Sequence, residues 1–445
     1  MLLGLMNGMV MQRAMNNVSD ITVESDFEIK SVKYISDNSE GYAYIENKGN
    51  SSYRIYGIPI GGPYTVVVNE EKFEDIYVGD VWLLAGQSNM QGVGRFRDYD
   101  LAYKGENDIR AFYMDNKWRK AHHPLHAAWL EKGSIHMEDN FESVPEGRYT
   151  GVGPGLMFAQ CMKEKTGVPQ GLICSAYGGA GFAYWAPEVE NTNPEMSLYL
   201  AMKKRFAANG KHVAGMLWYQ GEANESVYYT YSDDLKEFVG MMRDIWGDNM
   251  AFYNVQITSH NDTNNAWPNI AEIRYEQAEL IGEVDNYYLV CTMDYGSNAL
   301  DSDWAHPRNK KHIGDRLAYV ALSQYYGSEE FKLKDYGSPT VAKVEIKGSE
   351  ALVYFKYVGD GLQTSNGSDT VSGFYSQSAG QYLEAEIAGK NCVKVKLLDR
   401  AGNSITGESF RLVYGTGAMA DQSTCNLQNS NGIGALSFAY THVVE

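Results

Sequence analysis

Cysteine is scarce in this chain of 445 residues, which contains only five. They are Cys161, Cys174, Cys291, Cys392 and Cys425. An odd number without close spacing argues against both a disulfide framework and a zinc knuckle. We therefore expect reduced thiols and a cytoplasmic protein, although a secreted protein whose leader has been removed would look the same.

The sequence also lacks a long hydrophobic run. No apolar segment reaches about 18 residues, the length that a membrane-spanning helix needs. The first six residues are mostly apolar, but no basic residue precedes them, and Asn7, Gln12 and Arg13 interrupt the apolar pattern beyond them. This is a poor signal peptide, and we expect no membrane partner.

Positive charge is the smaller share, with 38 Lys and Arg against 56 Asp and Glu and a net charge of -18. An acidic surface disfavours nucleic acid and anionic membranes as partners. It is compatible with a neutral substrate. The hydrophobic share of 44% and charged share of 21% are typical of a globular protein, and the length predicts two or three packed units.

The two ends of the chain carry β patterns. Residues 1–76 predict an N-terminal β unit, because apolar and polar positions alternate between turn residues. Its expected strands include 31–35, 41–45 and 64–68, and its expected turns are 47–50 and 61–63. Residues 336–445 predict a C-terminal β domain. Its expected strands include 343–347, 351–355 and 392–397.

The middle, residues 77–335, alternates short apolar strands with amphipathic helical stretches. The expected strands are 81–85, 171–175, 213–218, 251–256 and 287–291, and the expected helices are 156–165, 233–246 and 270–281. Alternation of this kind predicts the α/β class, with a parallel sheet covered on both faces. The active site of such a sheet lies at the carboxyl ends of its strands.

A serine follows the first central strand, in the run Gly86-Gln87-Ser88-Asn89-Met90. A nucleophile needs a hydroxyl exposed on a tight turn and a backbone N–H aimed at the forming oxyanion. Ser88 alone could equally cap a helix.

Three further polar runs follow later positions of the same zone. Asp303 and His306 are three residues apart, which lets a carboxylate hold one imidazole nitrogen while the other faces a serine; a satisfied loop histidine is the alternative. Gln220 follows a central strand, and its amide could donate to an oxyanion, although an ordinary strand exit explains it too. The Gly178-Gly179 turn could offer an unhindered N–H, and it lacks the lysine and spacing of a phosphate-binding loop.

Taken together and in this order, the four runs resemble the SGNH hydrolases, in particular the bacterial sialate O-acetylesterase and acetylxylan-esterase-like families. Residues 86–90 match the nucleophile block, Gly178-Gly179 the glycine block and residues 220–222 the third block. Residues 303–310 match the final block. The resemblance implies a three-layer fold with a central parallel sheet, accompanied by sandwich-like accessory β units from the N- and C-terminal segments.

The resemblance also implies roles. Ser88 is the nucleophile, His306 the general base and then acid, and Asp303 the residue that orients His306. The oxyanion hole consists of the N–H groups of Ser88 and Gly179 with the side chain of Gln220. The supporting or substrate-contacting candidates are Gln87, Asn89, Glu222, Tyr184 and Trp185. Glu222 could also compete with Asp303 as the acid, and core packing is an alternative for Tyr184 and Trp185.

The reaction implied is hydrolysis of acetyl esters on sialic acid or plant-type oligosaccharides through an acyl-enzyme, with no metal and no cofactor. His122, His123 and His126 form a tempting metal cluster, which we interpret instead as active-site wall or plain loop. His260 could line the cleft.

Two other functions are compatible with the pattern. A non-catalytic carbohydrate-binding protein on a degenerate esterase core would be expected to have lost Ser88, Asp303 or His306. A lipase or thioesterase of the same fold would have a broad apolar pocket mouth, and would prefer longer acyl chains over acetyl. The sequence leaves open the acetylated sugar and the oligomeric state.

Overall fold

The computed structural model describes residues 1–96, 100, 103, 105–126, 150–247, 249–262, 264–295, 302–303 and 305–444. Contacts divide the chain into two compact units. The first contains residues 1–218, 237–252 and 310–318, and the second contains residues 219–236, 253–309 and 319–445. The division into 1–76, 77–335 and 336–445 stays a prediction.

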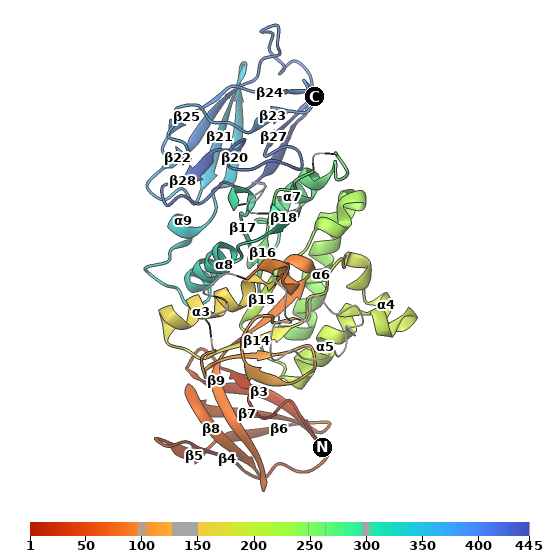
Figure 1. Ribbon diagram of the computed structural model, residues 1–445, viewed down its shortest axis with the longest axis vertical. Coiled ribbons are helices and arrows are strands. Elements are labelled where there is room, and N and C mark those ends of the chain that lie inside the picture. The colour runs from red at the N-terminus through yellow and green to blue at the C-terminus, as the bar shows by residue number, and fades with distance from the viewer. Residues whose placement is uncertain are drawn as a thin grey trace. The chain divides into compact units, whose positions relative to one another are not determined.

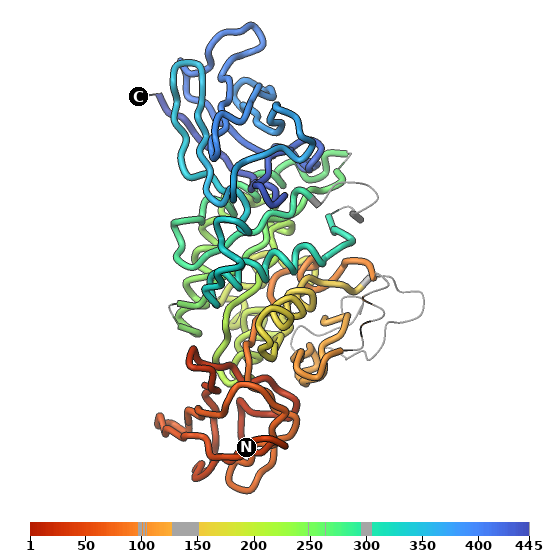
Figure 2. Tube along the Cα trace, turned by 90° about the vertical axis from the view of Figure 1, so that its left-hand side faces the viewer, coloured from red at the N-terminus to blue at the C-terminus, as the bar shows by residue number. Residues whose placement is uncertain are grey.

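The first unit begins with a set of short strands, red and orange in Figure 2. Their bounds are β1 (Leu2–Leu3), β2 (Val10–Gln12), β3 (Val18–Ser25), β4 (Val32–Ile35), β5 (Glu40–Tyr42), β6 (Tyr44–Gly49), β7 (Ser52–Pro59) and β8 (Gly61–Val68). One sheet has the order β1-β3-β7-β6, whereas β4 pairs with β5 and β8. The expected turn at 61–63 is wrong. These residues belong to β8, and register shifts on either side of Tyr64 accommodate Gly61 and Gly62 at φ of 122° and 127°.

Strand β9 (Glu71–Gly86) continues from these strands into the central sheet (Figure 1). Its first part pairs antiparallel with β8, and residues from Asp80 onward pair parallel with β14 (Gln170–Cys174). Every residue from Ile76 to Gly86 is buried, as expected of a parallel strand covered on both faces.

The central sheet of the first unit has the order β12-β11-β14-β9-β15-β16. The further strands are β11 (Ile109–Phe112), β12 (Trp118–Lys120), β15 (Gly215–Tyr219) and β16 (Ala251–Val255), and a separate pair is β10 (Gly94–Arg95) with β13 (Thr150–Val152). The helical segments are α1 (Ser88–Gln91), α3 (Pro154–Thr166), η1 (Phe182–Tyr184), α4 (Glu188–Thr192), η2 (Pro194–Met196) and α5 (Leu198–Ala208). Figure 1 shows α3 and α5 on opposite sides of these strands, so the expected α/β arrangement is confirmed.

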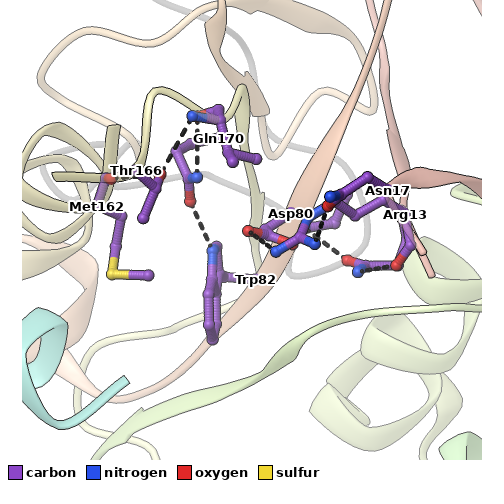
Figure 3. Close-up of polar contacts among 10 residues, drawn as sticks. Arg13, Asn17, Asp80, Trp82, Met162, Thr166 and Gln170 are labelled. Atoms are coloured by element: carbon purple, nitrogen blue, oxygen red, sulfur yellow. Dashed lines mark hydrogen bonds and ion pairs between the residues drawn. The ribbon is translucent and has the colours of Figure 1, made fainter. Parts of the chain in front are cut away.

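Buried polar contacts hold β9 in this sheet (Figure 3). The indole Nε1 of Trp82 donates to Oε1 of Gln170 at 2.8 Å, which joins β9 to β14. On the other side of the strand, the Asp80 carboxylate forms an ion pair with Arg13. The ring of Phe158 on α3 packs edge-on against Trp82, with centroids 4.9 Å apart.

The second unit contains the end of β16, which neighbours β17 (Tyr287–Val290), and a set of antiparallel strands. Its helical segments are η3 (Glu222–Thr230), α7 (Ile270–Glu279), η4 (Met293–Tyr295) and α9 (Leu333–Tyr336), while α6 (Tyr231–Trp246) and α8 (Lys311–Gln324) have residues in both units. Its further strands are β18 (Ser302–Asp303), β19 (His306–Pro307), β20 (Thr340–Lys347), β21 (Glu350–Lys356), β22 (Leu362–Thr364), β23 (Phe374–Ser376), β24 (Gln381–Tyr382), β25 (Ala385–Gly389), β26 (Cys392–Lys396), β27 (Phe410–Tyr414), β28 (Leu427–Asn429) and β29 (Phe438–His442).

The C-terminal strands, blue in Figure 1, form three antiparallel sheets. Their orders are β20-β21-β26-β25, β24-β23-β27-β29 and β22-β28. The five central strands and three helices named from the sequence are all present. Their ends differ by at most two residues, except that β9 begins at Glu71, ten residues before the expected start at 81. No helix in the described part of the chain is long and apolar enough to cross a membrane.

Candidate active site

The turn after β9 presents Ser88 as the first residue of α1. Gly86 has a φ of 130°, which favours glycine and lets the strand turn sharply into the helix. Gln87 occupies the N-cap position, so the alternative that Ser88 caps this helix is wrong. Ser88 is half-buried, whereas Gln87 and Asn89 on either side of it are buried. The serine is therefore the accessible residue of the turn.

The glycine block lies beside this turn, within the same unit. A methyl group added at Gly178 would lie 3.8 Å from the Cβ of Ser88 and 2.8 Å from Oε1 of Gln91. Gly179 has a φ of 73° and is exposed, and a methyl group added at this position would meet no other atom within 4 Å. The structure thus brings together the serine turn and the glycine turn that the sequence singled out separately.

The third block, residues 220–222, directly follows β15 and belongs to the second unit. Gly221 has a φ of 153°, and a side chain there would lie 2.8 Å from Ile273. Gln220 is fully buried, and its Nε2 donates to Oδ1 of Asn224 at 2.7 Å. Tyr231 donates its hydroxyl to the Gln220 side-chain oxygen at 3.1 Å. These contacts orient the Gln220 amide with its nitrogen toward Asn224.

Glu222 is the first residue of η3 and is buried. Burial, and after it the Glu222 carboxylate, hold the pKa of the Tyr219 hydroxyl well above its ordinary range. The Tyr219 hydroxyl therefore stays protonated at neutral pH.

Asp303 and His306 are brought together by the backbone of the second unit. Strands β18 and β19 form a two-stranded antiparallel pair in which Asp303 and His306 are direct register partners. Opposite residues of an antiparallel pair have Cα atoms about 4.5–5.5 Å apart. The side chain of Asp303 lies outside the described part of the structure, and that of His306 is half-buried. The roles of both residues stay predictions.

His260 lies in the same unit as His306. Burial first, then Arg274 and His306, lower the pKa of His260 to about 4, although a backbone contact with Thr258 opposes this. Its Nδ1 lies 3.1 Å from the Thr258 carbonyl oxygen. The Nδ1 position therefore carries the proton of a neutral ring.

The histidines at 122, 123 and 126 lie in the described part of the chain. No group of three or more His, Cys, Asp or Glu side chains among the described residues is arranged to hold an ion. Burial is the main cause that lowers the pKa of His123 and of His126 to about 3. His122 is half-buried.

The two aromatic candidates have different surroundings. Trp185 is fully buried, with its ring centroid 5.0 Å from Trp218 and 5.8 Å from Phe238, which is core packing. Tyr184 is 39% exposed and thus could contact a ligand.

Sequence reasoning assigned no role to two polar residues that lie next to the candidates. Asn224 orients Gln220, and its place in the Gln-Gly-Glu-Ala-Asn run was the available signal. Lys310 is fully buried, and its ammonium group donates to Oδ1 of Asn89, the residue after Ser88. Lys310 belongs to the final block, four residues after His306.

Comparison with known proteins shows first the class and then the family. The chain is similar to the crystal structure of a carbohydrate acetylesterase from Xanthomonas citri, with a TM-score of 0.74, 21% identity and 98% of each chain covered. This likeness shows the fold, which is α/β. Residues 78–323 match the family described as carbohydrate esterase, sialic acid-specific acetylesterase. This is more than half of the chain, and the protein belongs to that family.

Two curated relatives are similar over parts of their length. A protein of Arabidopsis thaliana named "Probable carbohydrate esterase" is 29% identical over 162 residues, which are 32% of this chain and 54% of that protein. The human sialate O-acetylesterase is 23% identical over 354 residues, which are 67% of this chain and 64% of that enzyme. The chain therefore spans between about half and two thirds of the length of these relatives.

Proposed function

We propose that this protein is a carbohydrate O-acetylesterase that removes acetyl groups by a Ser-His-Asp mechanism. The observation that carries the proposal is the meeting of two family blocks at one sheet edge. Ser88 opens the helix after β9, and the Gly178-Gly179 turn lies against it. A nucleophile beside exposed backbone N–H groups is the arrangement that acyl transfer requires.

The mechanism assigns each step to a named group. Ser88 attacks the acetyl carbonyl carbon while His306 accepts the hydroxyl proton, and Asp303 stabilises the charged imidazole. The N–H groups of Ser88 and Gly179, with the Gln220 amide, bind the oxyanion. His306 then protonates the departing sugar oxygen. Water repeats the sequence on the acetyl-enzyme and releases acetate.

The contacts of the final block support this assignment. Lys310 donates to Asn89, the residue immediately after Ser88, and Lys310 is the fourth residue after His306 in the chain. The register of β18 and β19 pairs Asp303 with His306. Gln220 has its side-chain nitrogen fixed by Asn224, which limits its rotation.

The proposal also includes the domain architecture, the cellular location and the substrate. We propose a three-layer SGNH-hydrolase domain over 77–335, with accessory β units at 1–76 and 336–445. All five cysteines lie in the described part of the chain as buried thiols outside any disulfide. This supports our proposal of a reducing, cytoplasmic location. The proposed substrate is an acetylated sialic acid or plant-type oligosaccharide.

The test is acetate release from a panel of acetylated glycans by the wild-type protein and by Ser88→Ala. The half-buried hydroxyl contributes little to packing, so the variant should melt at the wild-type temperature. Loss of the nucleophile should lower kcat by about 10⁴-fold or more. Substantial remaining hydrolysis by a folded Ser88→Ala protein would refute the serine mechanism.

A further inference from the structure

The backbone N–H of Ala176 donates its hydrogen bond to a histidine side chain and not to a neighbouring strand. Beyond the end of β14 the chain still follows β9, because Ser175 donates its N–H to Leu84 at 2.9 Å and Tyr177 donates to Gly86 at 3.1 Å. Successive N–H groups of an extended segment point to opposite sides. The Ala176 N–H therefore points away from β9, and it donates to Nε2 of His126 at 3.1 Å.

His126 is suited to be a permanent acceptor. Its side chain is almost completely buried, at 1% exposure. Burial, followed by the positive charge of Arg205, lowers its pKa to about 3. The imidazole is therefore neutral at any pH at which the protein would be assayed, and because Nε2 accepts a hydrogen bond, the single proton lies on Nδ1.

The contact lies two residues before the glycine turn. A Cβ at Gly178 would lie 2.8 Å from Gln91 Oε1, so this turn packs closely on the helix that begins with Ser88. Donors of an oxyanion hole act only within about 2.7–3.1 Å of the oxygen. A shift of the Ala176–Gly179 segment by a few tenths of an ångström would consequently weaken them.

We propose that His126 is a positioning residue that holds the Ala176–Gly179 segment in register with Ser88. This inference rests on the proposed function, because it assigns the segment to the oxyanion hole. Without an acceptor at His126, the buried N–H of Ala176 must move to find another partner, and the glycine turn moves with it. His126 acts through the backbone and does not touch the substrate.

The experiment compares His126→Leu, which has no acceptor, with His126→Gln, whose Oε1 can take the place of Nε2. His212→Leu is the control, since His212 is half-buried and its side chain contacts the Thr22 hydroxyl in the N-terminal strands. With 4-nitrophenyl acetate, His126→Leu should lower kcat by about 10- to 100-fold, a loss typical of misplaced catalytic groups. KM should change less than about threefold, His126→Gln should recover most of kcat, and His212→Leu should leave kcat unchanged.

Three kinetic results would overturn the inference, each in protein that keeps its near-ultraviolet circular dichroism. They are a kcat of His126→Leu within about twofold of wild type, a loss confined to KM, and a His126→Gln variant as poor as His126→Leu. A purely structural role of His126 predicts the last of these.

A measurement on the wild-type protein tests the contact if His126→Leu does not fold. Long-range ¹⁵N–¹H spectra at pH 7 should show His126 with a protonated Nδ1 and an unprotonated Nε2, and a protonated Nε2 would overturn the inference. This readout does not depend on turnover. If wild-type hydrolysis survives Ser88→Ala, the proposed function fails even where the spectrum confirms the contact.

Discussion

Replacing Asp80 by asparagine should destabilise the protein without impairing its chemistry. The Asp80 side chain is fully buried and that of Arg13 is 7% exposed. Arg13 Nε lies 2.8 Å from Oδ1 of Asp80, and its Nη2 lies 3.2 Å from Oδ2. Nη1 of Arg13 donates to Asn17 at 2.7 Å (Figure 3). Asp80→Asn would leave the guanidinium charge in the interior without a counter-charge.

The size of the effect follows from this burial. Removing one partner of a buried ion pair costs roughly 3–5 kcal/mol, because the remaining charge stays desolvated. Asn17 keeps its contact and the new amide oxygen can still accept, so we expect about 3 kcal/mol. At about 2–4 °C per kcal/mol for a unit of this size, the Tm should fall by roughly 6–12 °C.

The assay is thermal and urea unfolding followed by tryptophan fluorescence, with kcat measured well below the transition. Asp315→Asn is the control, because its partner Lys311 is 52% exposed and such a surface pair contributes only about 0.5 kcal/mol. The double variant Arg13→Met/Asp80→Leu should recover much of the loss, since it removes both charges. A melting temperature of Asp80→Asn equal to that of the control would refute the reasoning, as would a large loss of kcat in the folded variant.

Four other predictions concern the candidate site and its surroundings. Asp303→Asn should lower kcat on 4-nitrophenyl acetate by roughly 10³- to 10⁴-fold, and Glu222→Gln should cost less; the reverse order would move the acid to the third block. Tyr231→Phe removes a hydrogen bond to Gln220, so kcat should fall by roughly fivefold to tenfold. An unchanged kcat would show that the Gln220 amide does not stabilise the oxyanion. EDTA should leave the rate of hydrolysis unchanged. A loss of activity that zinc restores would indicate instead that the histidines at 122, 123 and 126 bind a metal. Burial lowers the pKa of His123 in the folded protein to about 3, from an ordinary value of 6.5. The neutral side chain therefore contributes fully to stability above about pH 6.5, and this contribution is lost as the pH falls toward 3. His123→Gln should flatten the acid limb of the stability profile, measured as urea midpoints from pH 4 to 7.

The central strands were predictable because a parallel strand covered on both faces is a continuous apolar run. Residues 81–85 and 287–291 have this pattern; the first run lies within β9, and residues 287–290 of the second form β17. The N-terminal strands were less predictable. The expected strand at 41–45 is interrupted at Ala43, where the chain passes from the sheet of β4 to that of β7. Sheet membership depends on partners far along the chain, and a local pattern does not contain it.

For the candidate site, too, the sequence determined some features and the tertiary structure decided others. The sequence by itself determined which chemical groups are present and that they follow strand ends: a serine after β9, a glycine pair after β14, and a carboxylate three residues from a histidine. Only the tertiary structure decided that Gly178 lies against Ser88, that Trp185 is a core residue, and that His126 accepts from Ala176. The physical reason is distance along the chain. His126 and Ala176 are 50 residues apart, and Lys310 and Asn89 are 221 apart, so no periodicity or spacing records these contacts, and packing of the whole sheet selects them.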